Sequence, residues 1–339
     1  RMATCKFFSL LHPACEDHDA GWGHPERPSR LGAVGEGIAR CGAAEAVVMV
    51  SPRPATRAEL LRVHDESHVA ALESLCNAGG GRIDADTRAS AGSWRAALAA
   101  AGAGVDATER LRRGEADAAF VAVRPPGHHA TPSAAMGFCL LNNVAITAAA
   151  LADEGERVLI VDFDAHHGNG TQEAFYGDGR VTYVSLHQWP LYPGTGWLDE
   201  TGKGAGAGET VNIPLPARAT GDVYLEALDR VVLPVAERVR PTWLLVSAGF
   251  DGHRADPLAG LDLSAGDFAD MVSRLIGVVE AGRRVVVLEG GYDLAALADS
   301  TAASVAALAG HAWHPEKPTS GGPGHELVEA AARSIRREP

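Results

Sequence analysis

The chain has 339 residues, of which 46% are hydrophobic and 22% charged, and its formal net charge is −13 at pH 7. This composition is typical of a globular protein that buries a large core, and the length is compatible with one α/β domain. The acidic balance argues against general binding to the phosphate backbone of nucleic acids and suits cationic substrates instead.

No apolar run reaches the roughly 20 residues that a membrane-spanning helix needs, and we see no basic-then-apolar secretory leader. Arg1 precedes Met2, and we interpret it as a remnant of expression. The cysteines form no Cys-x-x-Cys pair, which argues against a disulfide framework or a structural zinc site. They are Cys5, Cys15, Cys41, Cys76 and Cys139. We therefore expect a cytoplasmic protein with no membrane or nucleic-acid partner.

Short β-branched runs alternate with longer alanine-rich stretches along the chain. The expected strands are Thr4–Leu10, Val47–Val50, Ala119–Val123, Val158–Asp162, Val181–Leu186, Trp243–Ser247 and Arg284–Leu288. The expected helices are Ala91–Arg112, Asn142–Asp153, Val223–Arg238, Ser264–Ala281 and Leu294–Ala309. This alternation predicts a central, mostly parallel sheet with helices on both faces. No linker or repeat divides the chain, so we interpret residues 1–339 as a single domain.

Ionisable residues follow several of these strands, at the edge where open parallel sheets bind ligands. Side chains alternate along an extended segment, so Asp162, Asp164 and His166 are expected to share one face. Such a cluster requires a cation or good hydrogen-bond partners. Asp251 follows another apolar strand and would supply a third ligand, which leaves an open position as in catalytic zinc sites. The alternative to a metal site is a structural hydrogen-bond network among these side chains.

Two further segments carry candidate catalytic groups. His128 and His129 follow a Pro-Pro-Gly turn. Beside a metal they indicate general acid–base chemistry, although adjacent histidines alone are often surface residues. Tyr292 follows two glycines and would donate to a developing oxyanion, unless it merely ends a strand at a Gly-Gly bend.

The motifs occur in order from His24 to Tyr292 and cover most of the chain. They are RPPGHHA (124–130), VDFDAHHGNGT (161–171), SLHQWPLYPGTG (185–196), SAGFDGHRADPLAG (247–260) and EGGYD (289–293). Together they resemble the histone deacetylase and acetylpolyamine amidohydrolase family, and look most like its bacterial class II-type members. The resemblance implies the arginase-deacetylase fold and a zinc-dependent amidohydrolase that removes acyl groups from amines such as Nε-acetyl-lysine.

The resemblance also implies roles for individual residues. Asp164, His166 and Asp251 would bind one zinc ion, His129 would take the proton of the attacking water, and Tyr292 would donate to the oxyanion. A histidine would later protonate the leaving amine.

Partners of the two histidines follow from the same resemblance. His128 is expected to lie against Asp162, and His129 against Asn169. Class I members have an aspartate in place of Asn169, whereas an asparagine is usual in class II-like relatives. A neutral partner should raise the pKa of His129 less than a carboxylate would.

The family also carries alkali-metal sites, so the resemblance implies structural K⁺ or Na⁺. Residues that match the first site are Asp162, Asp164, His166, Ser185 and Leu186. Residues that match part of a second site are Phe175, Asp178 and Val181.

A substrate channel is implied as well. Phe138 and Tyr192 match its walls, Gly137 matches a backbone carbonyl that accepts the substrate amide, and Arg30 matches a buried arginine near the floor. Leu258 stands where one polyamine-selective group has an acid, which argues against a polyamine deacetylase. That function stays open because acidic residues near the rim would attract a polyamine, unless they only form a solvated loop; they are Glu16, Asp17 and Asp19.

Two more hypotheses concern the chemistry itself. Arginases carry an aspartate that helps to hold a second manganese, where this chain has Gly168, so we predict one catalytic metal and disfavour a ureohydrolase. A catalytically silent binding protein is disfavoured because every expected catalytic position is filled. The implied partner is a small-molecule or peptide acyl-amine, and an oligomer is compatible with the sequence.

Overall fold

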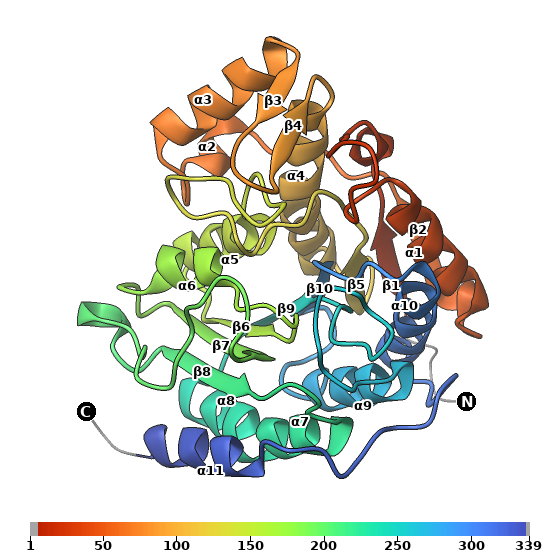
Figure 1. Cartoon of the computed structure of the whole chain (residues 1–339), viewed down its shortest axis with the longest axis vertical. Coiled ribbons are helices and arrows are strands. Elements are labelled where there is room, and N and C mark those ends of the chain that lie inside the picture. Colours follow the sequence, from red (N-terminus) through yellow and green to blue (C-terminus); the bar gives the residue numbers. More distant parts are fainter. Residues whose placement is uncertain (1–5, 337–339) are drawn as a thin grey trace.

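The computed structural model describes residues 6–336, so Arg1, Cys5 and the start of the expected strand Thr4–Leu10 lie outside it. An eight-stranded sheet has the order β2-β1-β5-β10-β9-β6-β7-β8, and all of its pairings are parallel (Figure 1). Its strands are β1 (Phe7–Leu10), β2 (Val47–Val50), β5 (Ala118–Val121), β6 (Val158–Asp162), β7 (Val181–Gln188), β8 (Thr210–Leu215), β9 (Trp243–Ala248) and β10 (Arg284–Leu288). The predicted central parallel sheet is confirmed.

Helices cover both faces of this sheet, as predicted (Figure 1). One face carries α4 (Ser93–Arg112), α5 (Asn143–Asp153) and α6 (Asn169–Phe175). The other carries α1 (Ser29–Arg40), α7 (Gly221–Ala227), α8 (Leu233–Val239), α9 (Ala265–Leu275) and α10 (Leu294–Leu308), with α11 (His325–Ser334) beside β8. The central strands are apolar without alternation because both of their faces are buried.

Shorter elements complete the fold. They are α2 (Arg57–Leu60), α3 (Glu66–Asn77), the antiparallel pair β3 (Gly80–Arg82) and β4 (Arg88–Ser90), the 3₁₀ turns Pro13–Glu16, Ala44–Ala46 and Gly204–Gly206, and a π-helical turn at Leu228–Val232. The π turn interrupts the single helix expected over Val223–Arg238. Pro234 follows it and lacks the N–H that would continue the α-helical ladder.

The core lies between the sheet and its two helical layers, and a smaller apolar cluster lies under α2, α3 and α4. Within residues 6–336, no helix combines the length and apolar character needed to cross a membrane. The strands β5, β6, β9 and β10 are neighbours, and their carboxyl ends carry the motif segments. The topology therefore gathers those segments at one edge of the sheet.

Candidate functional site

Three candidate metal ligands converge at this edge. Asp164 and His166 follow β6, and Asp251 follows β9. The strands pair in register, with Asp162 opposite Ser247, so the two segments leave the sheet side by side. One ligand atom from each of Asp164, His166 and Asp251 lies within 4.8 Å of the others. The sequence pattern and the fold thus bring the same three side chains together.

Glycines and backbone amides shape the space around these carboxylates. A Cβ on Gly249 would lie 1.9 Å from the carboxylate of Asp164, and a Cβ on Gly290 would lie 2.5 Å from that of Asp251. The N–H of Gly290 donates to Asp164 at 2.8 Å, and the N–H of Ala165 donates to Asp251 at 2.9 Å. Each carboxylate is therefore held in one orientation.

Electrostatics indicate that the cluster suits a cation. Burial, together with the negative charge of Asp164, raises the pKa of Asp251 to about 7. Burial favours a neutral ring for His166, but the carboxylates of Asp251 and Asp164 raise its pKa to about 10. Nδ1 of His166 lies 2.8 Å from Asp251. Asp164 differs from Asp251, because burial opposes its charge but the neighbouring His128 and His166 lower its pKa. Two buried carboxylates and one imidazole at this distance are a donor set that fits a zinc-like ion.

His128 lies beside this cluster, after β5. Its Nδ1 is 3.0 Å from the carboxylate of Asp162, which also accepts the hydroxyl of Tyr183 at 3.0 Å. Burial of His128 opposes its charge, but the carboxylates of Asp164 and Asp162 raise its pKa well above the usual value. The two carboxylates therefore favour the protonated form of His128.

His129 has the opposite electrostatic character. Burial and the neighbouring His128 and His166 hold its pKa well below the usual value. Nδ1 of His129 lies 2.8 Å from Oδ1 of Asn169, the first residue of α6. The ring centroids of His129 and His128 are 4.1 Å apart, so two imidazoles with opposite pKa shifts lie in contact.

Tyr292 faces the same region from the segment after β10. Its ring lies under the Arg30 guanidinium at 4.9 Å and meets the ring of Phe138 edge-on at 5.7 Å. Its backbone N–H donates to Asp256 at 2.6 Å. Burial raises the pKa of the Tyr292 hydroxyl well above its usual value, although Arg30 opposes the shift. The hydroxyl therefore keeps its proton and can serve as a donor.

Two of the expected channel residues, Gly137 and Tyr192, pack against His129. Gly137 has φ +56°, and a Cβ there would lie 2.5 Å from the His129 ring. Phe138 follows it with φ +69°. Tyr192 is 39% exposed and meets His129 edge-on at 5.2 Å. Leu258 is half-buried, and its N–H donates to Asp256, the carboxylate that also accepts the N–H of Tyr292.

The two groups of expected alkali-metal residues lie in different places. Asp162 and Ser185 are direct partners in the β6–β7 pairing, and Leu186 follows, so the first group lies beside the candidate metal ligands. The second group spans the turn from the end of α6 to the start of β7; it consists of Phe175, Asp178 and Val181. There the N–H of Asp178 donates to the carbonyl of Phe175, and the Asp178 carboxylate pairs with Arg180.

Glu289 is a site residue to which the sequence reasoning gave no role. It is fully buried, and its carboxylate accepts the N–H groups of Gly127 and His128 at 2.7 and 3.1 Å and the hydroxyl of Ser247 at 3.1 Å. Burial raises its pKa to about 7. Glu289 thus holds the turn that presents the histidine pair. Its position at the end of a buried strand was the available signal.

A buried ion network supports the Tyr292 segment. Its acid is Glu26, to which the sequence reasoning also gave no role. Glu26 binds Arg124 through two contacts of 2.7 Å and Arg30 at 3.3 Å. Arg30 in turn donates to the carbonyls of Gly291 at 2.7 Å and Glu289 at 2.5 Å. Burial opposes the charge of Glu26, but His18 and Arg124 hold its pKa far below the usual range.

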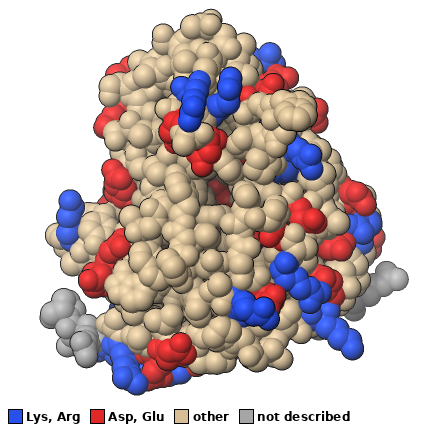
Figure 2. Space-filling view, viewed as in Figure 1, with Lys and Arg blue, Asp and Glu red and all other residues tan. Residues whose placement is uncertain are grey.

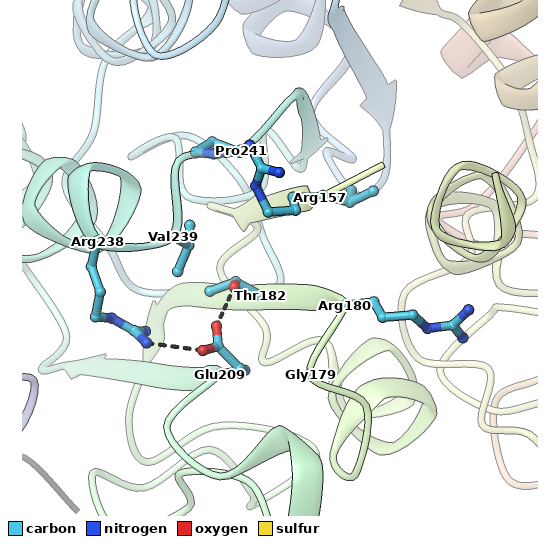
Figure 3. Close-up of a pocket in the computed structure, with 9 residues that line it drawn as sticks. Arg157, Gly179, Arg180, Thr182, Glu209, Arg238, Val239 and Pro241 are labelled. Carbon is cyan, nitrogen blue, oxygen red and sulfur yellow. Dashed lines mark hydrogen bonds and ion pairs between the residues drawn. The ribbon is translucent and has the colours of Figure 1, made fainter. Parts of the chain in front are cut away.

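The molecular surface distinguishes this edge from the opposite one. Figure 2 shows acidic side chains beside a hollow near the middle of the face on view. The pocket in Figure 3, of about 150 Å³, lies instead at the amino ends of β6 and β7, where Val158 and Thr182 line it. Its Arg238 pairs with Glu209. It contains none of the expected site residues.

Known proteins match this chain over most of its length. Residues 24–308 match the histone deacetylase domain. The chain belongs to the histone deacetylase family. A probable deacetylase from Archaeoglobus fulgidus is 42% identical over 308 residues, which are 89% of this chain and 86% of that protein. The histone deacetylase-like amidohydrolase of Pseudomonas aeruginosa is 38% identical over 80% of this chain and 73% of its own.

A solved structure supports the same assignment. The crystal structure of the HDA15 HD domain superposes with a TM-score of 0.90 at 36% identity, and covers 98% of this chain and 95% of that one. This histone deacetylase homologue therefore has the deacetylase fold, as predicted. It is a hydrolase that acts on amide bonds, and the substrates of its family are acylated amines.

Proposed function

We propose that this histone deacetylase homologue is a zinc-dependent deacylase of amines such as Nε-acetyl-lysine. The observation that carries the proposal is the cluster of the buried Asp164 and Asp251 with the half-buried His166, beside a histidine pair with opposite pKa shifts. Two oxygen donors and one nitrogen donor fit one zinc ion with an open position. Gly249 and Gly290 leave the space that the two carboxylates occupy. A zinc ion bound there would polarise the acyl carbonyl and acidify water.

The histidines would manage the protons. His129 is neutral, with Nδ1 engaged by Asn169, so its Nε2 is free to take the proton of the attacking water. The carboxylates of Asp164 and Asp162 favour the protonated form of His128, which would stabilise negative charge that develops beside it. The pair then returns a proton to the leaving amine.

The remaining site residues would bind and orient the substrate. The Tyr292 hydroxyl donates to the carbonyl oxygen as negative charge develops on it. Phe138 and Tyr192 would enclose the aliphatic stem of the acyl-amine, and the carbonyl of Gly137 would accept its amide N–H. We further propose K⁺ or Na⁺ beside Asp162 and Ser185, where a cation would offset the crowded carboxylates.

Polyamine deacetylation is the second candidate function. Burial and the negative charges of Asp86 and Asp84 raise the pKa of Tyr192, which means that acids lie close to the channel wall. Such acids favour a cationic substrate. Leu258 opposes this reading because, by the family resemblance, it stands where one polyamine-selective group has an acid. We therefore rank acyl-lysine first.

The proposed setting follows from the remaining sequence features. Residues 1–339 would form one deacetylase domain, with the sheet as its common core. A cytoplasmic location is supported by four free, buried cysteines, which suit a reducing compartment; they are Cys15, Cys41, Cys76 and Cys139.

The test is a hydrolysis assay on purified protein with its metal content measured. We expect about one zinc per chain and turnover of a fluorogenic acetyl-lysine peptide that exceeds turnover of acetylspermidine. Faster hydrolysis of acetylspermidine would select the second candidate. A protein that stays inert after zinc is added back would overturn both.

A further inference from the structure

The channel-wall residue Tyr192 lies on a long connection whose anchoring was not apparent from the sequence. The connection runs from residue 189 to residue 209, between β7 and β8. Tyr192 meets His129 edge-on at 5.2 Å, although 39% of Tyr192 is exposed. A loop that holds an exposed ring beside a catalytic imidazole needs fixed points of its own.

One carboxylate supplies the main fixed point. Oε1 of Glu200 accepts the backbone N–H groups of Gly196 at 2.8 Å and Trp197 at 3.0 Å. Oε2 of Glu200 accepts Nε2–H of Gln172, on α6, at 2.5 Å. Burial opposes the charge of Glu200, but these hydrogen bonds lower its pKa. The loop is thus tied to α6 by charge-assisted hydrogen bonds, which are the stronger kind.

Gln172 carries the connection onward to His167. Oε1 of Gln172 accepts Nδ2–H of Asn212 at 2.8 Å and lies 3.0 Å from Nε2 of His167. Because Oε1 only accepts, His167 bears its proton on Nε2, and its Nδ1 accepts the hydroxyl of Thr195 at 2.7 Å. Burial lowers the pKa of His167 to about 4, which agrees with a neutral ring.

These bonds close a ring of donors and acceptors. It runs from Thr195 to His167, Gln172 and Glu200, and returns to the loop at Gly196. Gly196 also packs against His167, since a Cβ at position 196 would lie 2.6 Å from that imidazole. His167 directly follows His166 in the sequence. The ring therefore joins the channel wall to the segment that carries a candidate metal ligand.

We propose that Glu200 is a positioning residue for substrate binding, which fixes the loop through this ring and places Tyr192 at the channel wall. The kinetic part of this inference rests on the proposed deacylase function. Tyr192 contacts the substrate alike in the ground state and the transition state, so loss of its position raises KM more than it lowers kcat.

The donors and acceptors of this hydrogen-bonded ring suggest one variant that breaks it and a second that restores it. In Glu200→Gln, the new side-chain amide can keep its oxygen toward the N–H groups of Gly196 and Trp197. Its NH₂ group then faces the NH₂ group of Gln172, and no hydrogen bond forms between them. Adding Gln172→Glu restores every bond, because Glu at 172 accepts from His167 and from the new amide at 200. The double variant has the wild-type charge and nearly the same atoms.

The experiment compares these two variants with the wild type and with Glu173→Gln, a control at an exposed position next to Gln172. The substrate is a fluorogenic acetyl-lysine peptide, and metal content is measured in parallel. We expect Glu200→Gln to raise KM on the order of tenfold, as for other coupled hydrogen-bonded residues, with kcat changed less than about twofold. The double variant should return KM to within about twofold of the wild type.

A second readout needs neither substrate nor metal. The rings of Trp189 and Trp197 lie 5.3 Å apart within the loop, so their near-ultraviolet circular dichroism reports its packing. We expect this signal to weaken in Glu200→Gln and to return in the double variant. A wild-type KM and signal in Glu200→Gln, or a double variant that restores neither, would overturn the inference. If the wild type lacks deacylase activity, the dichroism alone decides.

Discussion

Oδ1 of Asn169 lies 2.8 Å from Nδ1 of His129, so an uncharged acceptor orients the ring that we propose as the base. Because Oδ1 cannot donate, the proton of His129 resides on Nδ1 and Nε2 is left as the acceptor. Asn169 also begins α6, the helix that carries Gln172. The tautomer of the base and the anchoring of the channel-wall loop thus depend on one short helix.

Removing the base should separate chemistry from metal binding. We expect His129→Ala to lower kcat by about 10²–10⁴, the usual contribution of general acid–base catalysis, while zinc content stays at the wild-type level. Steady-state kinetics and elemental analysis measure the two effects. His311→Ala, at an exposed position, is the matched control. Near-normal turnover in His129→Ala would rule out the proposed role.

Removing a candidate ligand should have the opposite signature. In Asp251→Asn, we expect zinc content and activity to fall together, because a neutral amide is a much weaker ligand than a buried carboxylate. Elemental analysis after dialysis checks this result, with Asp262→Asn at the surface as control. Full retention of zinc by Asp251→Asn would show that the ion binds elsewhere.

The tyrosine hydroxyl can be removed without altering the shape of the ring. We expect Tyr292→Phe to keep its zinc and to lose about 10²–10³ in kcat, which is the typical cost of one oxyanion donor. The half-buried Tyr176, mutated to Phe, provides the control. Unchanged kcat in Tyr292→Phe would leave the ring with a packing role alone.

Stability should depend on pH through His64. Its Nδ1 lies 2.9 Å from the carbonyl of Thr131, and its Nε2 accepts the N–H of Asn142 at 2.9 Å, so the folded ring is neutral. Burial and the nearby His68 lower its pKa from 6.5 to about 4. The unfolded chain binds this proton near pH 6.5, so its contribution is complete above that pH and is lost as the pH falls to 4.

The size of this effect follows from linkage. A shift of this size corresponds to about 3 kcal/mol. Urea unfolding at pH 7 and pH 4.5 measures the loss of unfolding free energy, and His64→Gln, which cannot take up the proton, should reduce that loss. Identical pH dependence in the wild type and His64→Gln would contradict the assignment to His64.

The buried ion network should be sensitive to loss of its acid. Glu26→Gln leaves Arg124 and Arg30 without a counter-charge, and we expect a loss of about 3–5 kcal/mol in unfolding free energy. Urea unfolding gives the value directly. Glu36→Gln is the control, because that side chain is 66% exposed. A loss below about 1 kcal/mol in Glu26→Gln would show that solvent compensates the arginines.

Much of the fold was predictable because its central strands are short, apolar and bounded by polar residues. The predictions Val158–Asp162 and Arg284–Leu288 coincide with β6 and β10. The edge strand β8 was missed because Asn212 and Pro214 interrupt its apolar pattern, and proline is tolerated only where no neighbouring strand needs its N–H. The helix expected over Ser264–Ala281 ends at Leu275, shortly before Gly277.

The candidate site was predictable where several ionisable residues follow a strand together, as Asp164 and His166 do. Glu200 was not predictable in this way, and Glu289 offered only its position at the end of a buried strand, because a single carboxylate that binds backbone amides leaves no periodic or paired signal in a sequence. Their roles depend on which distant N–H groups the fold brings near them, and that information requires coordinates.

Gly249 and Gly290 have no side chain, and this has a consequence for how sequence variation at these two positions is interpreted. A single methyl group at either position would intrude on the carboxylates of Asp164 and Asp251 while every titratable and nucleophilic atom stayed in place. A comparison restricted to reactive residues would score such a protein as intact. Natural homologues or engineered variants with alanine at either position should be classed as impaired in the proposed metal site, on steric grounds alone.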